Sequence, residues 1–178
     1  LIGRTLPHSP PLDKTSFSQK RLHCRFRKGF LFYAEYNLRL FWCLLFTSFD
    51  AVCSVDLDTL PAGCLTILLR RKRRVFDSHE YFTEVPEVTN RAFVKAIWEM
   101  VARICLPFYQ HAYTVGHGLA AIFEKKYGLP FSVIRNVPVR DFSVVSDKEK
   151  PYVLLYQGAL NEGRGIEVAL EAMQQFDD

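Results

Sequence analysis

Short apolar runs alternate with longer segments of helical periodicity through the first 138 residues of the chain. The runs are rich in β-forming residues and predict strands at Ala51–Val55, Arg74–Asp77, Ala112–Val115 and Phe131–Arg135. Between them, apolar residues recur with helical spacing, which predicts helices at Tyr33–Phe49, Leu60–Leu69, Arg91–Leu106 and His117–Tyr127. This alternation favours βαβ units and a parallel sheet. The predicted fold class is therefore α/β, with a Rossmann-like parallel sheet flanked by helices.

Several local expectations accompany these elements. Leu1–Gly3 is expected to end a strand, and Arg4–Gln19 to form a loop because it is rich in proline, serine and threonine. Ala51–Val55 is expected to be buried, and Asp58 or Thr59 to cap the helix that follows it. One face of the helix at Arg91–Leu106 is apolar, and it carries Phe93, Ile97, Met100, Val101 and Ile104.

Polar residues follow each predicted strand. They are Asp56 and Asp58, the segment Asp77–Glu80, the segment Gly116–Gly118, and Asn136. Right-handed crossovers place the carboxyl ends of parallel strands on one edge of a sheet, where ligands of open α/β sheets bind. We therefore expect these residues to line one rim.

The densest of these segments carries Asp77, His79 and Glu80 within four residues. At the end of a strand, such a group suits a ligand-binding crevice. The alternative is that Asp77 and Ser78 only cap the next segment and that His79 is a surface histidine.

The composition changes after Pro138. Residues 139–151 are rich in charged residues and serine and are predicted to be a linker, which makes 1–138 one domain. A second unit then begins over 152–178, with a strand at Tyr152–Tyr156 and a helix opened by Arg164 or Gly165. A strand, a glycine-containing loop and a helix N-terminus form a phosphate-binding arrangement. An ordinary turn between strand and helix is the alternative, because the glycines match neither the P-loop nor the dinucleotide-binding pattern.

The net charge and the cysteine pattern limit which binding partners and which cellular compartment are expected. The net charge is +4, and the basic residues cluster at Lys20–Lys28 and Arg70–Arg74. We interpret the second cluster as a solvated turn; the alternative is a contact with anionic lipid or a phosphorylated substrate. No nucleic-acid-binding signature is found, so no nucleic-acid partner is expected. None of the five cysteines forms a Cys-x-x-Cys pair, which favours free thiols in a reducing compartment over disulfides or a zinc site.

The most apolar segment, Leu38–Phe49, is shorter than the roughly 20 residues that span a bilayer. It is expected to be a buried core helix, with an interfacial helix as the alternative. The chain begins at Leu1 without a methionine and ends within a helical pattern. It is therefore expected to be a fragment of a longer protein.

Two segments together, Val133–Pro138 and Tyr156–Glu167, resemble the retaining glycosyltransferases of family 4, which have the two-domain GT-B fold. Asp77–Pro86 resembles a bacterial subset of that family, often associated with surface polysaccharides. The resemblance implies a glycosyltransferase that moves a sugar from a nucleoside-diphosphate sugar to a glycan or lipid-linked acceptor. It also implies a cytoplasmic protein, peripheral at the inner face of the membrane, with no cofactor and no metal.

The resemblance also assigns roles. His79 would face the transferred sugar, and Asp77 and Glu80 would shape its loop and meet the acceptor. Gly158 would let the backbone approach the diphosphate, and Arg164 would pair with it. The residues expected to bind the nucleotide-sugar are Gly158, Gly163, Arg164, Gly165 and Asn136.

The sequence departs from the family pattern in places. Ala159 stands where many relatives have arginine, and Gly116-His117-Gly118 replaces a small polar residue that opens a helix. The paired glutamates of the family would lie beyond Asp178, and the first strand and helix of the N-terminal domain would precede Leu1. The alternatives are a catalytically inactive GT-B scaffold and a sugar-nucleotide epimerase of similar fold. A further alternative is a peripheral membrane module that uses Arg70–Arg74 and the aromatic-rich segment Phe30–Phe49.

Overall fold

The central sheet of the computed structural model is parallel and four-stranded, in the order β3-β4-β5-β6. Its strands are β3 (Ala51–Val55), β4 (Arg73–Ser78), β5 (His111–Thr114) and β6 (Phe131–Val133). The structure describes residues 1–138, 154–158, 160 and 164–175. The predicted α/β class and parallel sheet are confirmed.

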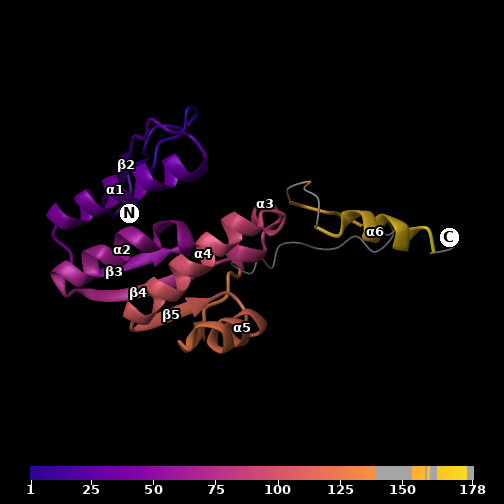
Figure 1. Cartoon of the computed structure of the whole chain (residues 1–178). Helices are drawn as coiled ribbons and strands as arrows, with labels where there is room; N and C mark the ends of the chain where they lie inside the picture. The colour runs from indigo at the N-terminus through magenta and orange to yellow at the C-terminus, as the bar shows by residue number, and fades with distance from the viewer. Residues whose placement is uncertain (139–153, 159, 161–163, 176–178) are drawn as a thin grey trace.

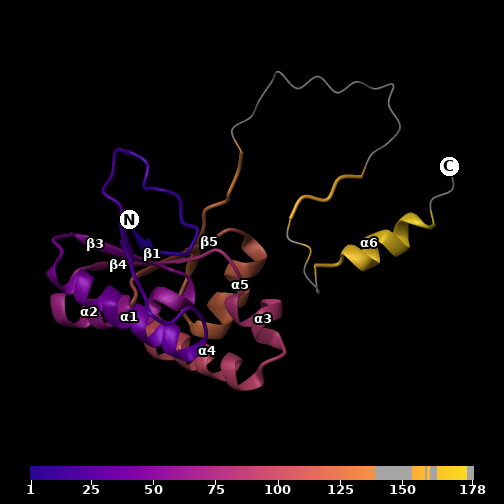
Figure 2. The same ribbon diagram turned by 90° about the horizontal axis from the view of Figure 1, so that it is seen from above.

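Helices connect the strands. They are α2 (Asp56–Arg70), α3 (Pro86–Thr89), α4 (Ala92–Cys105) and α5 (His117–Tyr127), with 3-10 turns η1 (Phe82–Glu84) and η2 (Leu106–Phe108) beside α3 and α4. Because each new strand is added on the same side of the last, right-handed crossovers put all the connecting helices on one face. Figures 1 and 2 show this arrangement: α1, α2 and α4 lie together on one side of the strands. The other face of the sheet carries no helix among the described residues.

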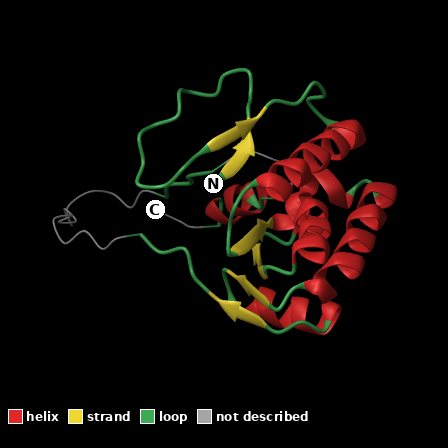
Figure 3. Ribbon diagram, turned by 90° about the vertical axis from the view of Figure 1, so that its left-hand side faces the viewer, coloured by secondary structure: helices red, strands yellow, loops and turns green. Residues whose placement is uncertain are grey.

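A second, smaller sheet precedes the central one. Its strands β1 (Ile2–Arg4) and β2 (Lys20–Leu22) are parallel, and α1 (Gly29–Phe46) follows them. No ladder joins it to β3 within the described residues, and a pocket of about 620 Å³ lies between, lined from Leu1, Lys20 and the whole of β3. Figure 3 shows the separation of the two sheets.

Most predicted elements are confirmed with small shifts in their ends, and β3 and α5 match their predicted bounds. The C-terminal end of α5 is also as expected, since Gly128 follows it with φ +69°. Two expectations about α2 and β3 are wrong. Helix α2 begins at Asp56, directly after Val55, with no side-chain cap. Residues of β3 alternate between buried and exposed, because one face of this edge strand is uncovered.

Helix α4 buries a different face from the predicted one. Its buried residues are Trp98, Ala102 and Cys105, whereas Phe93, Met100 and Ile104 are exposed. An apolar stripe ordinarily faces the core. Here Trp98 takes the core position, packing edge-on against Tyr33 of α1 and Phe82 of η1 at ring-centroid distances of 4.9 and 5.1 Å.

The core lies between the sheet and its helices. The largest fully buried apolar side chains are Phe76, Leu60, Ile67 and Leu106. Phe76 of β4 makes edge contacts with the rings of Tyr109 and Phe131, with centroids 6.1 Å away in both cases. All five cysteines are free thiols, as expected from their spacing.

Gly63 is the point of closest approach between α2 and β3. A Cβ atom there would overlap the hydroxyl oxygens of Ser54 and Tyr109, which are hydrogen-bonded to each other at 2.7 Å in the buried interior. We expect Gly63→Ala to lower the free energy of unfolding by about 1–3 kcal/mol through overpacking. This loss exceeds the gain in helix propensity of at most about 1 kcal/mol. Urea unfolding at neutral pH measures the difference.

Gly118 of α5 is the matched control. A Cβ atom at Gly118 meets no atom within 4 Å, so Gly118→Ala should leave the stability unchanged or raise it slightly. Equal urea midpoints for the Gly63 variant and the parent chain would contradict the close packing described above.

The last described element is α6 (Ile166–Met173), which begins after Gly165 and contains no buried residue. Of the predicted strand Tyr152–Tyr156, residues 152 and 153 lie outside the described residues, and Leu154–Tyr156 are not in a strand. The predicted linker at 139–151 and Gly163 also lie outside them. In the part of the chain that is described, no helix has the length and apolar character needed to cross a membrane.

Candidate functional site

The polar rim predicted from the sequence forms at the carboxyl ends of β3 and β4. The Thr114 hydroxyl of β5 donates to the carbonyl of Ser78 at 2.7 Å and fixes the end of β4. The Ser78 hydroxyl donates to the carbonyl of Glu80 at 3.1 Å, and the His79 backbone N–H donates to Asp56 Oδ1 at 3.0 Å. The loop after β4 is therefore held by β5 on one side and by the β3–α2 junction on the other.

His79 is held through both of its ring nitrogens. Its Nε2 lies 3.0 Å from Asp77 Oδ2, and its Nδ1 lies 3.4 Å from the side-chain nitrogen of Asn136. An amide nitrogen can only donate, so Nδ1 acts as acceptor and Nε2–H as donor to the carboxylate. In the neutral imidazole, these contacts place the proton on Nε2.

Asp77 links His79 to the sheet. It is 7% exposed, and its Oδ2 also accepts the hydrogen bond of the Tyr113 hydroxyl at 2.8 Å. Burial, followed by this hydrogen bond, raises the pKa of Tyr113, so the phenol remains a donor at neutral pH. The other oxygen, Oδ1, is buried without a hydrogen-bond partner. Because Oδ1 is enclosed by the protein, it is an unsatisfied acceptor of the fold and not an open ligand contact.

Two further carboxylates lie at the start of α2. Asp56 has φ 53°, a left-handed conformation that non-glycine residues rarely adopt outside functional or strained positions. Burial raises the pKa of Asp56, against the opposing effect of the His79 N–H. Burial, followed by the charge of Asp56, raises the pKa of Asp58 to about 6. Perturbed carboxyls next to a histidine are typical of functional sites.

The structure brings some predicted site residues together and not others. Asp77, His79 and Asn136 meet directly, and Glu80 is exposed beside them. Gly158, Arg164 and Gly165 are described, but no hydrogen bond among the described residues joins them to His79. Their role in binding a nucleotide-sugar stays a prediction.

Tyr113 is a site residue that sequence reasoning missed. It lies directly opposite Asp77 in the β4–β5 register, on the uncovered face of the sheet. Its hydroxyl also lies 3.9 Å from Cys53 Sγ of β3. The alternation of side chains along Ala112–Val115 places Tyr113 on one face of its strand. It could identify Tyr113 as a site residue only if the order of the strands were already known.

The donor set of the rim is carboxylate, imidazole, phenol and amide. Among the described residues, no group of three or more histidine, cysteine, aspartate or glutamate side chains could hold a metal ion. No family model matches this sequence, and no curated protein is similar enough to count as a match. The site therefore has to be interpreted from its own chemistry.

Proposed function

We propose that the full-length protein is a glycosyltransferase that moves a sugar from a nucleoside-diphosphate sugar to a glycan or lipid-linked acceptor with retention. The observation that carries the proposal is the group of Asp77, His79 and Asn136 at the carboxyl rim of a parallel sheet. This is the edge at which α/β proteins bind their ligands. The resemblance of Tyr156–Glu167 to the donor-binding segment of family 4 supports the choice of a sugar donor.

The side chains of the rim suit a hydroxyl-rich ligand. The buried Asp77 carboxylate fixes the ring of His79, whose exposed atoms can contact a sugar hydroxyl. His79 is 40% exposed at its side chain, so its ring can contact the same ligand while Asp77 and Asn136 keep its orientation. Glu80, exposed beside it, would meet the acceptor.

Bond cleavage between sugar and diphosphate leaves growing negative charge on the diphosphate. Fixed donors and cations placed at that charge lower the barrier. Arg164 precedes α6, and Gly165 adopts φ 72° directly before its first turn. A guanidinium beside a helix N-terminus is suited to bind a diphosphate. Gly158 and Gly163 would allow the diphosphate to approach the backbone closely.

One sequence feature favours a second candidate. Ala159 stands where many relatives have an arginine, which removes one expected phosphate contact. This departure favours a GT-B scaffold without transferase activity. A sugar-nucleotide epimerase is the other alternative, because it shares the fold that the resemblance implies. The free thiols suit a reducing compartment and thus a cytoplasmic protein, placed at the inner membrane face if the acceptor is lipid-linked.

The test uses the full-length protein and a panel of nucleotide-sugars. Calorimetric titration should show binding of at least one donor, and incubation with acceptor should release the free nucleoside diphosphate. An epimerised sugar as product would assign the protein to the epimerases. Absence of binding to every donor in the panel would overturn the proposal and favour the scaffold.

A further inference from the structure

A mainly apolar groove lies among the helices, and none of the rim side chains lines it. It is a groove of about 350 Å³ between α1, α2 and α4. Its lining is mainly apolar: it includes Tyr33 and Ala34 of α1, Pro61 of α2, and Ile97 and Trp98 of α4. Asn37, its amide member, is engaged with backbone groups at both ends of its side chain. A hydrocarbon chain is the kind of ligand that such a lining accepts.

Exposed apolar side chains extend this groove onto the surface. Phe30 of α1 lines the groove and is exposed. On α4, Phe93, Met100 and Ile104 follow one another at helical spacing and are all exposed. Isolated exposed apolar residues need no explanation, but several on one face of a helix that lines a mainly apolar groove indicate an interaction surface.

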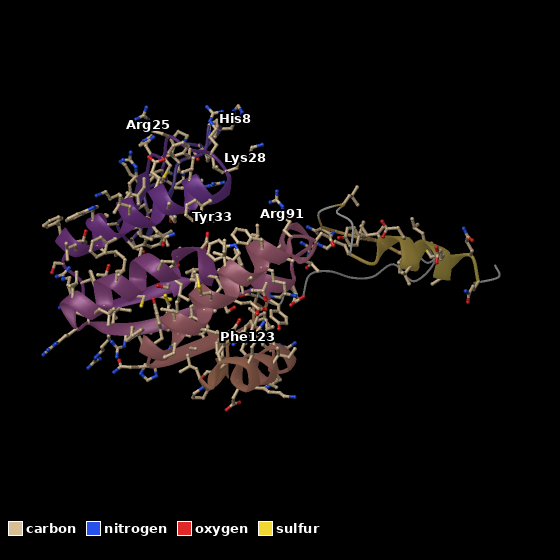
Figure 4. All side chains as sticks on the ribbon, in the orientation of Figure 1. His8, Arg25, Lys28, Tyr33, Arg91 and Phe123 are labelled. Carbon is tan, nitrogen blue, oxygen red and sulfur yellow. The ribbon has the colours of Figure 1, made fainter. Side chains whose placement is uncertain are left out.

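Cations lie at the open end of the groove. Arg91 is the one charged residue among the described residues that line it, and Lys28 immediately precedes α1. Figure 4 shows Lys28 and Arg91 near the ends of α1 and α4, with Tyr33 between the two helices. Apolar side chains with cations beside them match the boundary between lipid headgroups and acyl chains. A symmetric pair of copies fits less well, because it would bring the same cations together.

The groove lies toward the same end of the molecule as the polar rim. Helices α2 and α4 each follow a strand, so they begin at the carboxyl end of the sheet, and most of their residues that line the groove lie in their first halves. The basic cluster at Arg70–Arg74 lies at the opposite end of α2. There Arg70 donates to the carbonyl of Leu44 at 2.8 Å and covers the ring of Phe49 at 4.8 Å. Arg70 therefore stabilises the fold through contacts within the chain.

We propose that this surface, the groove with Phe30, Phe93, Arg91 and Lys28, docks the protein on an anionic bilayer and takes one lipid chain into the groove. The bilayer would then present a lipid-linked acceptor at the end of the molecule that carries His79. In that respect the inference rests on the proposed function. Docking itself requires no sugar transfer, so the two can fail separately.

The first experiment is vesicle flotation. The chain should float with vesicles of phosphatidylcholine containing 30% phosphatidylglycerol and not with phosphatidylcholine alone. Arg91→Gln should weaken the partition about fivefold, whereas Lys125→Gln on α5 should not. Phe93→Ser should weaken it too. Its matched control is Phe46→Ser, since Phe46 is 80% exposed and Phe93 79%.

The second experiment locates the chain. The protein has two tryptophans: Trp98 lines the groove, and Trp42 lies in the second half of α1. Lipids brominated on the acyl chain should quench the fluorescence of the Trp42→Phe variant, which keeps Trp98, and not that of Trp98→Phe. Flotation independent of anionic lipid, dimer formation abolished by Phe93→Ser, or quenching of Trp42 alone would overturn the proposal. If the protein floats with anionic vesicles but transfers no sugar, the proposed docking surface stands and the proposed transferase activity is wrong.

Discussion

Replacing His79 with alanine in the full-length protein is expected to lower the rate of sugar transfer by about 10²–10⁴-fold, the usual loss for a positioned catalytic side chain. The imidazole is held by Asp77 and Asn136, and alanine removes both contacts and the group that would face the sugar. Initial rates with the donor identified by titration give the measurement. Donor affinity should change much less than the rate, because the donor would be held mainly by the other domain.

His111 provides the matched control. It is exposed at the first position of β5, at the opposite end of the sheet from the rim. His111→Ala should therefore keep the transfer rate within about twofold. If the circular dichroism spectrum of His79→Ala matches that of the parent protein, unfolding is excluded as the cause of its lower transfer rate. A fully active His79→Ala enzyme would show that the rim has no catalytic role.

Asp58→Asn is expected to stabilise the chain at pH 7.5 by about 1–3 kcal/mol. Burial, then the charge of Asp56, raises the pKa of Asp58 from 3.8 to about 6, and a pKa difference of one between the folded and unfolded states corresponds to about 1.4 kcal/mol. At pH 7.5 the folded protein therefore carries a carboxylate that its surroundings disfavour. The amide removes this cost. Urea unfolding at pH 7.5 measures the gain.

The sign of the pH dependence provides a second readout. Between about pH 4 and 6 the folded state holds a proton on Asp58 that the unfolded state has lost, so this carboxyl makes stability fall as pH rises. Above pH 6 its contribution is constant. The parent chain should thus lose stability relative to Asp58→Asn across this window. Asp50→Asn, at an exposed carboxylate, should follow the parent chain. Parallel stability curves for Asp58→Asn and the parent would contradict the assignment.

The rim was predictable because it depends on topology alone. Once the strands are parallel and joined by right-handed crossovers, the residues after each strand meet at one edge. The structure brings four of these residues together around His79: Asp56, Asp77, His79 itself and Asn136. Tyr113 was not predicted, because its contact with Asp77 requires the register of β4 against β5.

Other features depend on tertiary contacts, which the spacing of apolar residues along the sequence does not reveal. Helix α4 carries apolar residues over more than one face, and the ring contacts of Trp98 decide which face is buried. Strand β2 consists of Lys20, Arg21 and Leu22. Its sequence has no strand pattern, and its pairing with β1 defines it.

No strand of the described residues pairs with the outer edge of β3, and this has a consequence for handling the isolated chain. Its residues Ala51–Val55 carry no charge, and natural edge strands usually rely on charges or prolines to prevent pairing between molecules. Each copy therefore exposes a short template for intermolecular β-pairing. Concentrated solutions of the chain should be prone to precipitation, and a lysine on this edge should improve solubility.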